Sequence, residues 1–133
     1  GAVNNPSPDT YVAYCFAPVA GYSAFGSYTG NGSSDGPFIY LGFRPRFLLI
    51  KQSSAAGLSW WMLDTTRSSY NAVGNYLFAD LTNAEADYAS TNPYDFLSNG
   101  FKVRVATTVT NASGATYIYA AFAENPFKYA LAR

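Results

Sequence analysis

The clearest structural signal in this chain is the stretch Ser98-Asn99-Gly100-Phe101-Lys102-Val103-Arg104-Val105. Asn-Gly is the dipeptide that best supplies the two positive φ angles of a type I′ turn, which joins two antiparallel strands. After the turn, apolar and basic side chains alternate. A period of two places Phe101, Val103 and Val105 on one face of a strand and the two basic residues on the other. The stretch therefore predicts a β-hairpin whose second strand is half buried.

Further strands are expected on both sides of this hairpin. Apolar and aromatic runs occur at residues 10–17, 21–28, 38–43, 47–51, 58–63 and 116–123. The four consecutive apolar residues 47–50 predict a strand buried on both faces. Loops rich in Gly, Asn and Ser separate the runs, the strongest at residues 29–37. Roughly eight short strands with frequent turns are typical of an all-β, antiparallel β-sandwich or jelly-roll-like barrel, and we predict such a fold.

Two regions are less regular. Residues 1–9 contain the Asn, Pro, Ser and Asp typical of a linker, so we assign a single β domain to residues 10–133. Residues 64–95 lack clear periodicity, which in a compact domain is often a sign of function. Within this region, one short helix is possible from Asn83 to Tyr88.

Nearly the same strand occurs twice. Residues 10–17 read TYVAYCFA, and residues 116–123, 106 positions further on, read TYIYAAFA. Self-similarity at a fixed offset indicates a repeat unit, and this offset is the size of a domain. One interpretation makes residues 10–17 the closing strand of a preceding repeat unit, and the other makes the two segments sister strands of one sheet. In the first case a strand is left over, which must pair with its own sheet or with a neighbouring chain.

The composition favours a compact domain with aromatic surfaces. Charged residues make up 12% of the 133 residues and aromatic residues 18%, against a usual charged share of about 25%. Eight basic residues balance eight acidic ones and form no cluster, so we expect no nucleic-acid partner. No apolar run approaches a membrane span and no signal peptide opens the chain, so we expect no membrane insertion.

Several catalytic chemistries lack the residues that they need. The chain has no histidine, which removes Ser-His-Asp and Cys-His nucleophiles and the usual zinc sites. The single cysteine, Cys15, lies in an apolar run, which predicts a buried and inert thiol. There is no P-loop and no dinucleotide-binding glycine pattern. We therefore expect a protein that is not an enzyme and needs no cofactor.

Carboxylates provide two weaker candidates. Glycoside hydrolysis needs two carboxyl groups roughly 5–10 Å apart, and the chain offers Asp64, Asp80, Glu85, Asp87 and Asp95. The alternative is that these are ordinary surface carboxylates. A weak candidate site for Ca²⁺, without EF-hand spacing, consists of Asp80, Asn83, Glu85 and Asp87.

An aromatic pair suggests a sugar-binding surface. Trp60 and Trp61 are adjacent on an expected strand, so they point to opposite faces, and one of them belongs to the core. An exposed ring beside hydrogen-bonding groups can bind a sugar. The predicted ligand-binding residues are Trp61, Asp64, Arg67, Tyr70 and Asn71. In this hypothesis Trp61 stacks on the sugar; if it is a core residue instead, Trp60 becomes the candidate. The alternative is that these aromatic residues pack in the core or between subunits.

Several of these segments together resemble a module of bacteriophage tail and tail-fibre proteins, a tandem β domain of unknown function. The resemblance is carried by residues 11–16, 21–32, 42–51, 61–67, 95–102 and 117–128. It implies a virion protein at the distal end of the phage tail, made in the cytoplasm of the bacterial host. It also implies a homotrimer that contacts other tail proteins and the host surface, and it assigns no catalytic residue.

Two functions follow as expectations. The first is a receptor-binding module that attaches to polysaccharide on the host cell surface. The second is a purely structural virion protein, for trimer assembly, for the tail tip or for capsid decoration, whose exposed aromatic side chains are buried between chains. A glycan depolymerase that uses a pair of the carboxylates ranks last.

Overall fold

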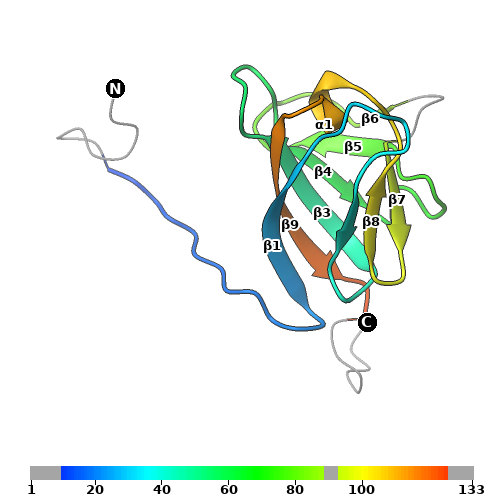
Figure 1. The fold of residues 1–133 in the computed structure, drawn as a ribbon. Helices are drawn as coiled ribbons and strands as arrows, with labels where there is room; N and C mark the ends of the chain where they lie inside the picture. The colour runs from blue at the N-terminus through cyan, green and yellow to red at the C-terminus, as the bar shows by residue number, and fades with distance from the viewer. Residues whose placement is uncertain (1–9, 89–92, 126–133) are drawn as a thin grey trace.

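The computed structural model describes residues 10–88 and 93–125, which form a sandwich of two antiparallel sheets (Figure 1). Sheet A has the strand order β1-β9-β3-β4-β5-β6, and sheet B has the order β2-β8-β7. The strands are β1 Ser23–Thr29, β2 Phe38–Tyr40, β3 Pro45–Gln52, β4 Trp61–Asp64, β5 Asn75–Phe78, β6 Ala86–Asp87, β7 Tyr94–Leu97, β8 Gly100–Val103 and β9 Thr116–Ala123. One short helix, α1 (Thr108–Asn111), precedes β9. The predicted all-β antiparallel sandwich is confirmed.

The core lies between the sheets because each strand turns alternate side chains inward. Leu48 and Leu63 of sheet A and Phe101 of sheet B are fully buried. Tyr28 and Tyr117 stack with their ring centroids 4.9 Å apart, and the Phe101 ring meets Tyr28 edge-on. The strand over residues 47–50 is buried on its inner face, whereas Phe47 on the outer face is only half buried.

The hairpin predicted around Asn99-Gly100 joins β7 and β8, but its turn differs. Leu97 pairs with Gly100, so the two loop residues are Ser98 and Asn99 and the glycine belongs to β8. A Cβ at Gly100 would lie 2.0 Å from the carbonyl oxygen of Ile39 in the adjacent β2. The predicted type I′ turn with Gly100 as a turn residue is therefore wrong. Gly100 is instead the strand position at which β2 comes too close for a side chain. The half-buried second strand is confirmed.

The short helix expected at residues 83–88 is also wrong. Ala86 and Asp87 form β6 and pair with Tyr76 and Asn75 of β5. Backbone pairing along the sheet edge replaces the local helical bonds there. In residues 10–88 and 93–125, no helix is long and apolar enough to cross a bilayer. The linker assigned to residues 1–9 lies outside the described residues.

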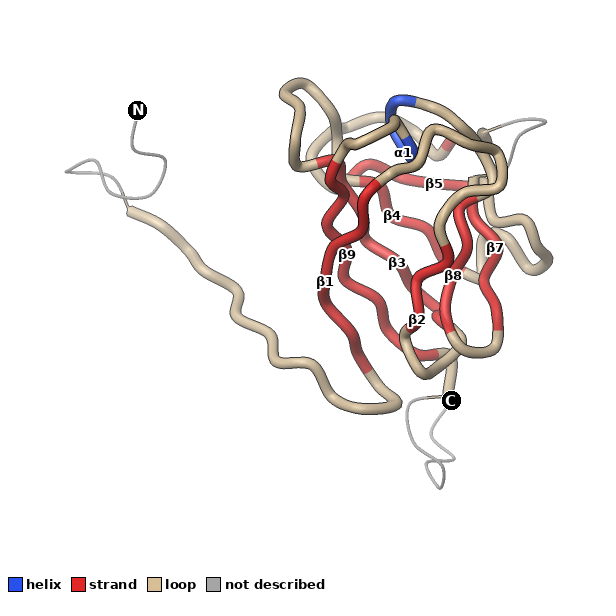
Figure 2. The backbone as a smooth tube through the Cα atoms, viewed as in Figure 1, coloured by secondary structure: helices blue, strands red, loops and turns tan. Residues whose placement is uncertain are grey.

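Residues 10–17, predicted as a strand, form none and are called the arm from here on. They run as an extended segment away from the sandwich (Figures 1 and 2). Cys15, predicted to be buried, is exposed. The similar segment β9 lies instead inside sheet A, paired with β1 and β3. The two segments are therefore not sister strands of one sheet. β9 pairs with a strand on each side, whereas the arm pairs with none of the described strands.

Candidate functional site

The outer face of sheet A is unusually apolar for a sheet face that is not covered by another layer. Alternation turns Phe25 of β1, Phe122 of β9 and Phe47 of β3 toward this face. The Phe122 ring lies 5.8 Å from the Phe25 ring and 6.2 Å from the Phe47 ring, measured between centroids. Because one face of an antiparallel sandwich sheet normally carries polar residues, this aromatic row is a candidate contact surface.

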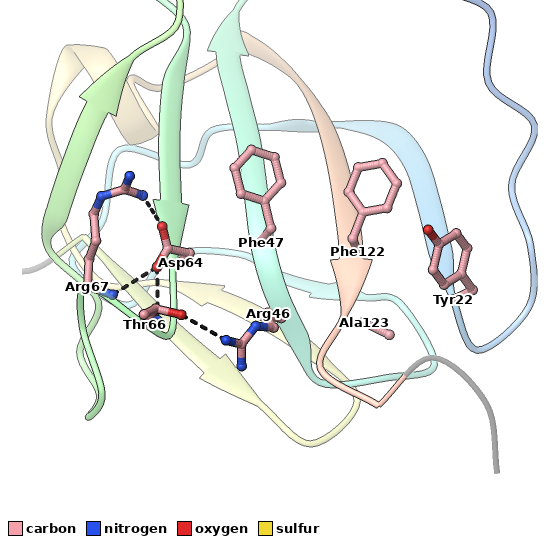
Figure 3. A pocket seen from close by; sticks show the side chains of 8 residues that line it. All are labelled: Tyr22, Arg46, Phe47, Asp64, Thr66, Arg67, Phe122 and Ala123. Atoms are coloured by element: carbon pink, nitrogen blue, oxygen red, sulfur yellow. Dashed lines mark hydrogen bonds and ion pairs between the residues drawn. The ribbon is translucent and has the colours of Figure 1, made fainter. Parts of the chain in front are cut away.

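A groove of about 530 Å³ opens at one end of this row (Figure 3). It is lined by Tyr22, Arg46, Phe47, Asp64, Thr66, Arg67, Phe122 and Ala123. The three aromatic side chains stand on one side, and the charged side chains with Thr66 stand on the other. The groove thus offers apolar ring faces beside hydrogen-bonding groups, which is the usual make-up of a small-ligand site.

Asp64, the last residue of β4, builds the polar side of the groove. One carboxylate oxygen accepts hydrogen bonds from the backbone N–H groups of Thr66 (2.9 Å) and Arg67 (2.8 Å). This Asx-type turn reverses the chain directly after the strand. The other carboxylate oxygen pairs with the guanidinium of Arg67, whose Nε also donates to Glu85 at 2.8 Å. Asp64 and Glu85 together hold the Arg67 guanidinium in place at the groove.

Arg46 supplies a less constrained cation. It lies on β3 and is exposed, and its guanidinium donates to the Thr66 hydroxyl at 2.9 Å. A guanidinium carries five N–H donors. Within residues 10–88 and 93–125 this is the one side-chain bond recorded for Arg46, so further donors remain for a ligand.

The structure brings together two of the five predicted ligand-binding residues. Asp64 and Arg67 line the groove, but Trp61 points to the core, is 6% exposed and stacks on Tyr76 at 4.2 Å. The proposed stacking of Trp61 on a ligand is therefore wrong. Its neighbour Trp60 is half buried, with the ammonium of Lys51 5.7 Å from its ring centroid, and it does not line the groove.

The other two predicted residues lie in the loop between β4 and β5. Tyr70 is 86% exposed and lines no groove. The carboxamide of Asn71 donates to the carbonyl of Phe96 and accepts from its N–H, both at 2.9 Å. Asn71 therefore ties this loop to β7 and has a structural role.

Sequence reasoning missed the aromatic side of the groove and Arg46. Phe47 and Phe122 are adjacent because β3 and β9 pair in that register. The two residues are 75 positions apart, so the sequence alone does not show that they are neighbours. The one signal in the sequence is the apolar run at residues 47–50, which predicts burial on both faces and not an open outer face.

Asp64 and Glu85 share the Arg67 guanidinium, but the carboxylates do not gather into a metal site. In the described residues no group of three or more His, Cys, Asp or Glu side chains could hold a metal ion. Of the weak Ca²⁺ candidates, Asp80 accepts the backbone N–H of Trp60 at 3.0 Å, while Glu85 pairs with Arg67. Asp95 lies on sheet B and pairs with Arg104 at 3.0 Å. The acidic groups are thus distributed over both sheets and several are neutralised by arginines.

Comparison with known proteins places the chain in one family. Residues 1–126 match the Domain of unknown function (DUF7483). No curated protein and no solved structure matches the chain. Because the match covers nearly the whole sequence, the chain belongs to the DUF7483 family.

Proposed function

We propose that this protein is a non-enzymatic module of a bacteriophage tail fibre that attaches to polysaccharide on the host cell surface, and that the sugar binds in the groove of sheet A. The supporting observation is the placement of Phe47 and Phe122 opposite Arg46, Asp64 and Arg67. The tail-fibre part of the proposal, with its distal place in the virion, rests on the sequence resemblance described above.

The chemistry of the groove suits a carbohydrate. The apolar C–H face of a pyranose packs against aromatic rings, and its hydroxyls or carboxylates take hydrogen bonds from charged groups. Arg67 is already oriented by Asp64 and Glu85, so it loses little conformational entropy when a ligand binds. Arg46 is not ion-paired in the described residues, so its guanidinium can donate to a hydroxyl or a carboxylate of the sugar.

Substitution of Arg46 tests this function. Arg46→Gln removes a cation that lines the groove and is exposed, so the fold should be retained while glycan binding falls about tenfold, the equivalent of one charge-assisted hydrogen bond. The measurement is binding to a glycan array and to host cells, with the melting temperature as a check. Arg104→Gln is the matched control, because Arg104 is an exposed arginine beside sheet B. If both variants bind as the unmodified protein does, or both lose binding equally, the groove is not the sugar site.

A structural role in the virion is the second candidate. It is favoured by the aromatic row on the outer face of sheet A, which could be buried against another subunit or another tail protein. In that case the protein binds no glycan or host cell at any concentration tested, and Phe25→Ser weakens assembly. Release of reducing ends from host polysaccharide would instead indicate a depolymerase.

A further inference from the structure

We propose that the arm of one copy adds as a strand to the open edge of β1 in a second copy, and so extends sheet A between molecules. The inference does not depend on the sugar groove. It rests on a donor segment and an acceptor edge that the same chain carries and that do not pair with each other in the structure.

The acceptor is the side of β1 that faces away from β9. Val19 and Ser23 exchange two backbone hydrogen bonds on that side, of 3.1 and 2.9 Å. Backbone groups of alternate residues in an antiparallel strand point to the same edge, so those of Phe25, Ser27 and Thr29 point there too. No described residue pairs with these three on that edge. Such a row of N–H and C=O groups is a template for another strand.

The donor is the arm, whose sequence closely follows that of β9. Both segments begin with Thr-Tyr and end with Phe-Ala, and Val12 corresponds to Ile118. Since β9 is the strand that pairs with the other side of β1, a segment of this composition is compatible with a β1 neighbour. The arm is extended, and Val12 and Tyr14 are 80% and 83% exposed. An extended apolar segment of this kind gains most by burial against a sheet.

The arm contacts β1 of its own chain through one ring pair, and we take the same face for the pairing between copies. The Phe16 ring stacks on the outward-facing Phe25 ring at 5.7 Å. If Phe16 keeps this face when the arm pairs with a second copy, the even-numbered arm residues share the outer face with Phe25. Paired residues in an antiparallel ladder point their side chains to the same face, so Val12, Tyr14 and Phe16 would exchange hydrogen bonds with β1. Odd-numbered residues, including Cys15, would turn to the opposite face.

The partner is a second copy because, apart from Phe16, which packs on Phe25 and Phe122 of its own sheet, the arm extends away from its own domain. On the N-terminal side of the turn at Val19–Ser23, the arm diverges from β1 and points away from the sandwich in both views (Figures 1 and 2). A second molecule carries the same edge, so each arm can find an acceptor and each acceptor an arm. Reciprocal exchange closes a dimer, and exchange in one direction around an axis closes a larger ring, including a trimer.

Proline substitutions on the two strands test the pairing. Ser27→Pro removes an N–H on the open edge while leaving the β9 side of β1 intact, and Ser27→Ala is the matched control. In the arm, Val12→Pro removes an N–H that would face β1, whereas Ala13→Pro removes one that would face solvent. We expect the unmodified chain, Ser27→Ala and Ala13→Pro to form an oligomer by light scattering. Ser27→Pro and Val12→Pro should have the mass of the 14.4 kDa chain.

The single cysteine provides an independent measurement without any substitution. In the oligomer Cys15 would lie within a paired strand, so its reaction with a thiol reagent should be roughly tenfold slower than in Ser27→Pro. The reaction should accelerate when the unmodified protein is diluted, since dissociation follows mass action. A monomer at all concentrations would overturn the proposal. So would an oligomer that survives both Ser27→Pro and Val12→Pro, or that is lost equally with Ala13→Pro.

Discussion

Asn111 shows at the scale of single residues how a buried amide organises a surface loop. Its side chain is fully buried, accepts the backbone N–H of Asn31 at 2.8 Å and donates to the carbonyl of Ser33 at 2.7 Å. The same amide also donates to the Asn31 side-chain oxygen at 2.8 Å. Loss of these bonds leaves polar groups of that loop without partners, at about 1–3 kcal/mol for each. We expect Asn111→Ala to lower the free energy of unfolding in urea by about 2–4 kcal/mol. The exposed Asn83→Ala is the control, and equal stability of the two variants would contradict this role.

Trp61 is a second residue whose role follows from its burial. Its ring packs against Tyr76, Phe78 and Tyr88 between the sheets. Trp61→Ala should lower the free energy of unfolding by about 3–5 kcal/mol, because it removes a large core side chain. The exposed Tyr70→Ala should change it by less than about 0.5 kcal/mol. Chemical denaturation followed by circular dichroism compares the two, and a stable Trp61→Ala variant would contradict the core assignment.

At the scale of elements, the close contact between β2 and β8 depends on a missing side chain. A methyl group at Gly100 would meet the Ile39 carbonyl at 2.0 Å, so Gly100→Ala must push the two strands apart. We expect a loss of about 1–3 kcal/mol in unfolding free energy, typical of overpacking. Gly57→Ala is the control, because no atom lies within 4 Å of its Cβ position and only its positive φ is strained. Thermal denaturation of both variants measures the difference, and a loss for Gly100→Ala no larger than that for Gly57→Ala would contradict the close contact as its cause.

At the scale of the whole molecule, the buried tyrosines predict how stability depends on pH. Burial raises the pKa of Tyr28 and of Tyr94 above the usual value for phenols. The unfolded chain releases these protons near pH 10 while the folded protein keeps them, so stability is fully present below about pH 10 and falls above it. Urea denaturation from pH 7 to about pH 11.5 should show the loss, and Tyr28→Phe should reduce it. A stability independent of pH in this range would contradict the burial of the phenol groups.

Local patterns in the chain were sufficient for the fold class. Alternation over residues 101–105 predicted the half-buried strand of the β7–β8 hairpin, because strand period is a property of neighbouring residues. The Asn99-Gly100 dipeptide predicted a turn between these strands, but with the wrong two turn residues. Asp64 and Arg67, both predicted as ligand-binding residues, line the groove together because the turn after β4 holds them within four residues.

Other features depended on the pairing of distant strands. Phe47 meets Phe122 through the register of β3 and β9, and Gly100 is required by β2 rather than by the turn. Trp61 faces the core and not the groove because Leu63 on the same strand faces the core as well. The arm and β9 share much of their sequence but not their structure. Sequence by itself therefore determined the β-strand character and the local turn that joins Asp64 to Arg67. Only tertiary structure decided which faces meet, because register and burial depend on residues far apart in the chain.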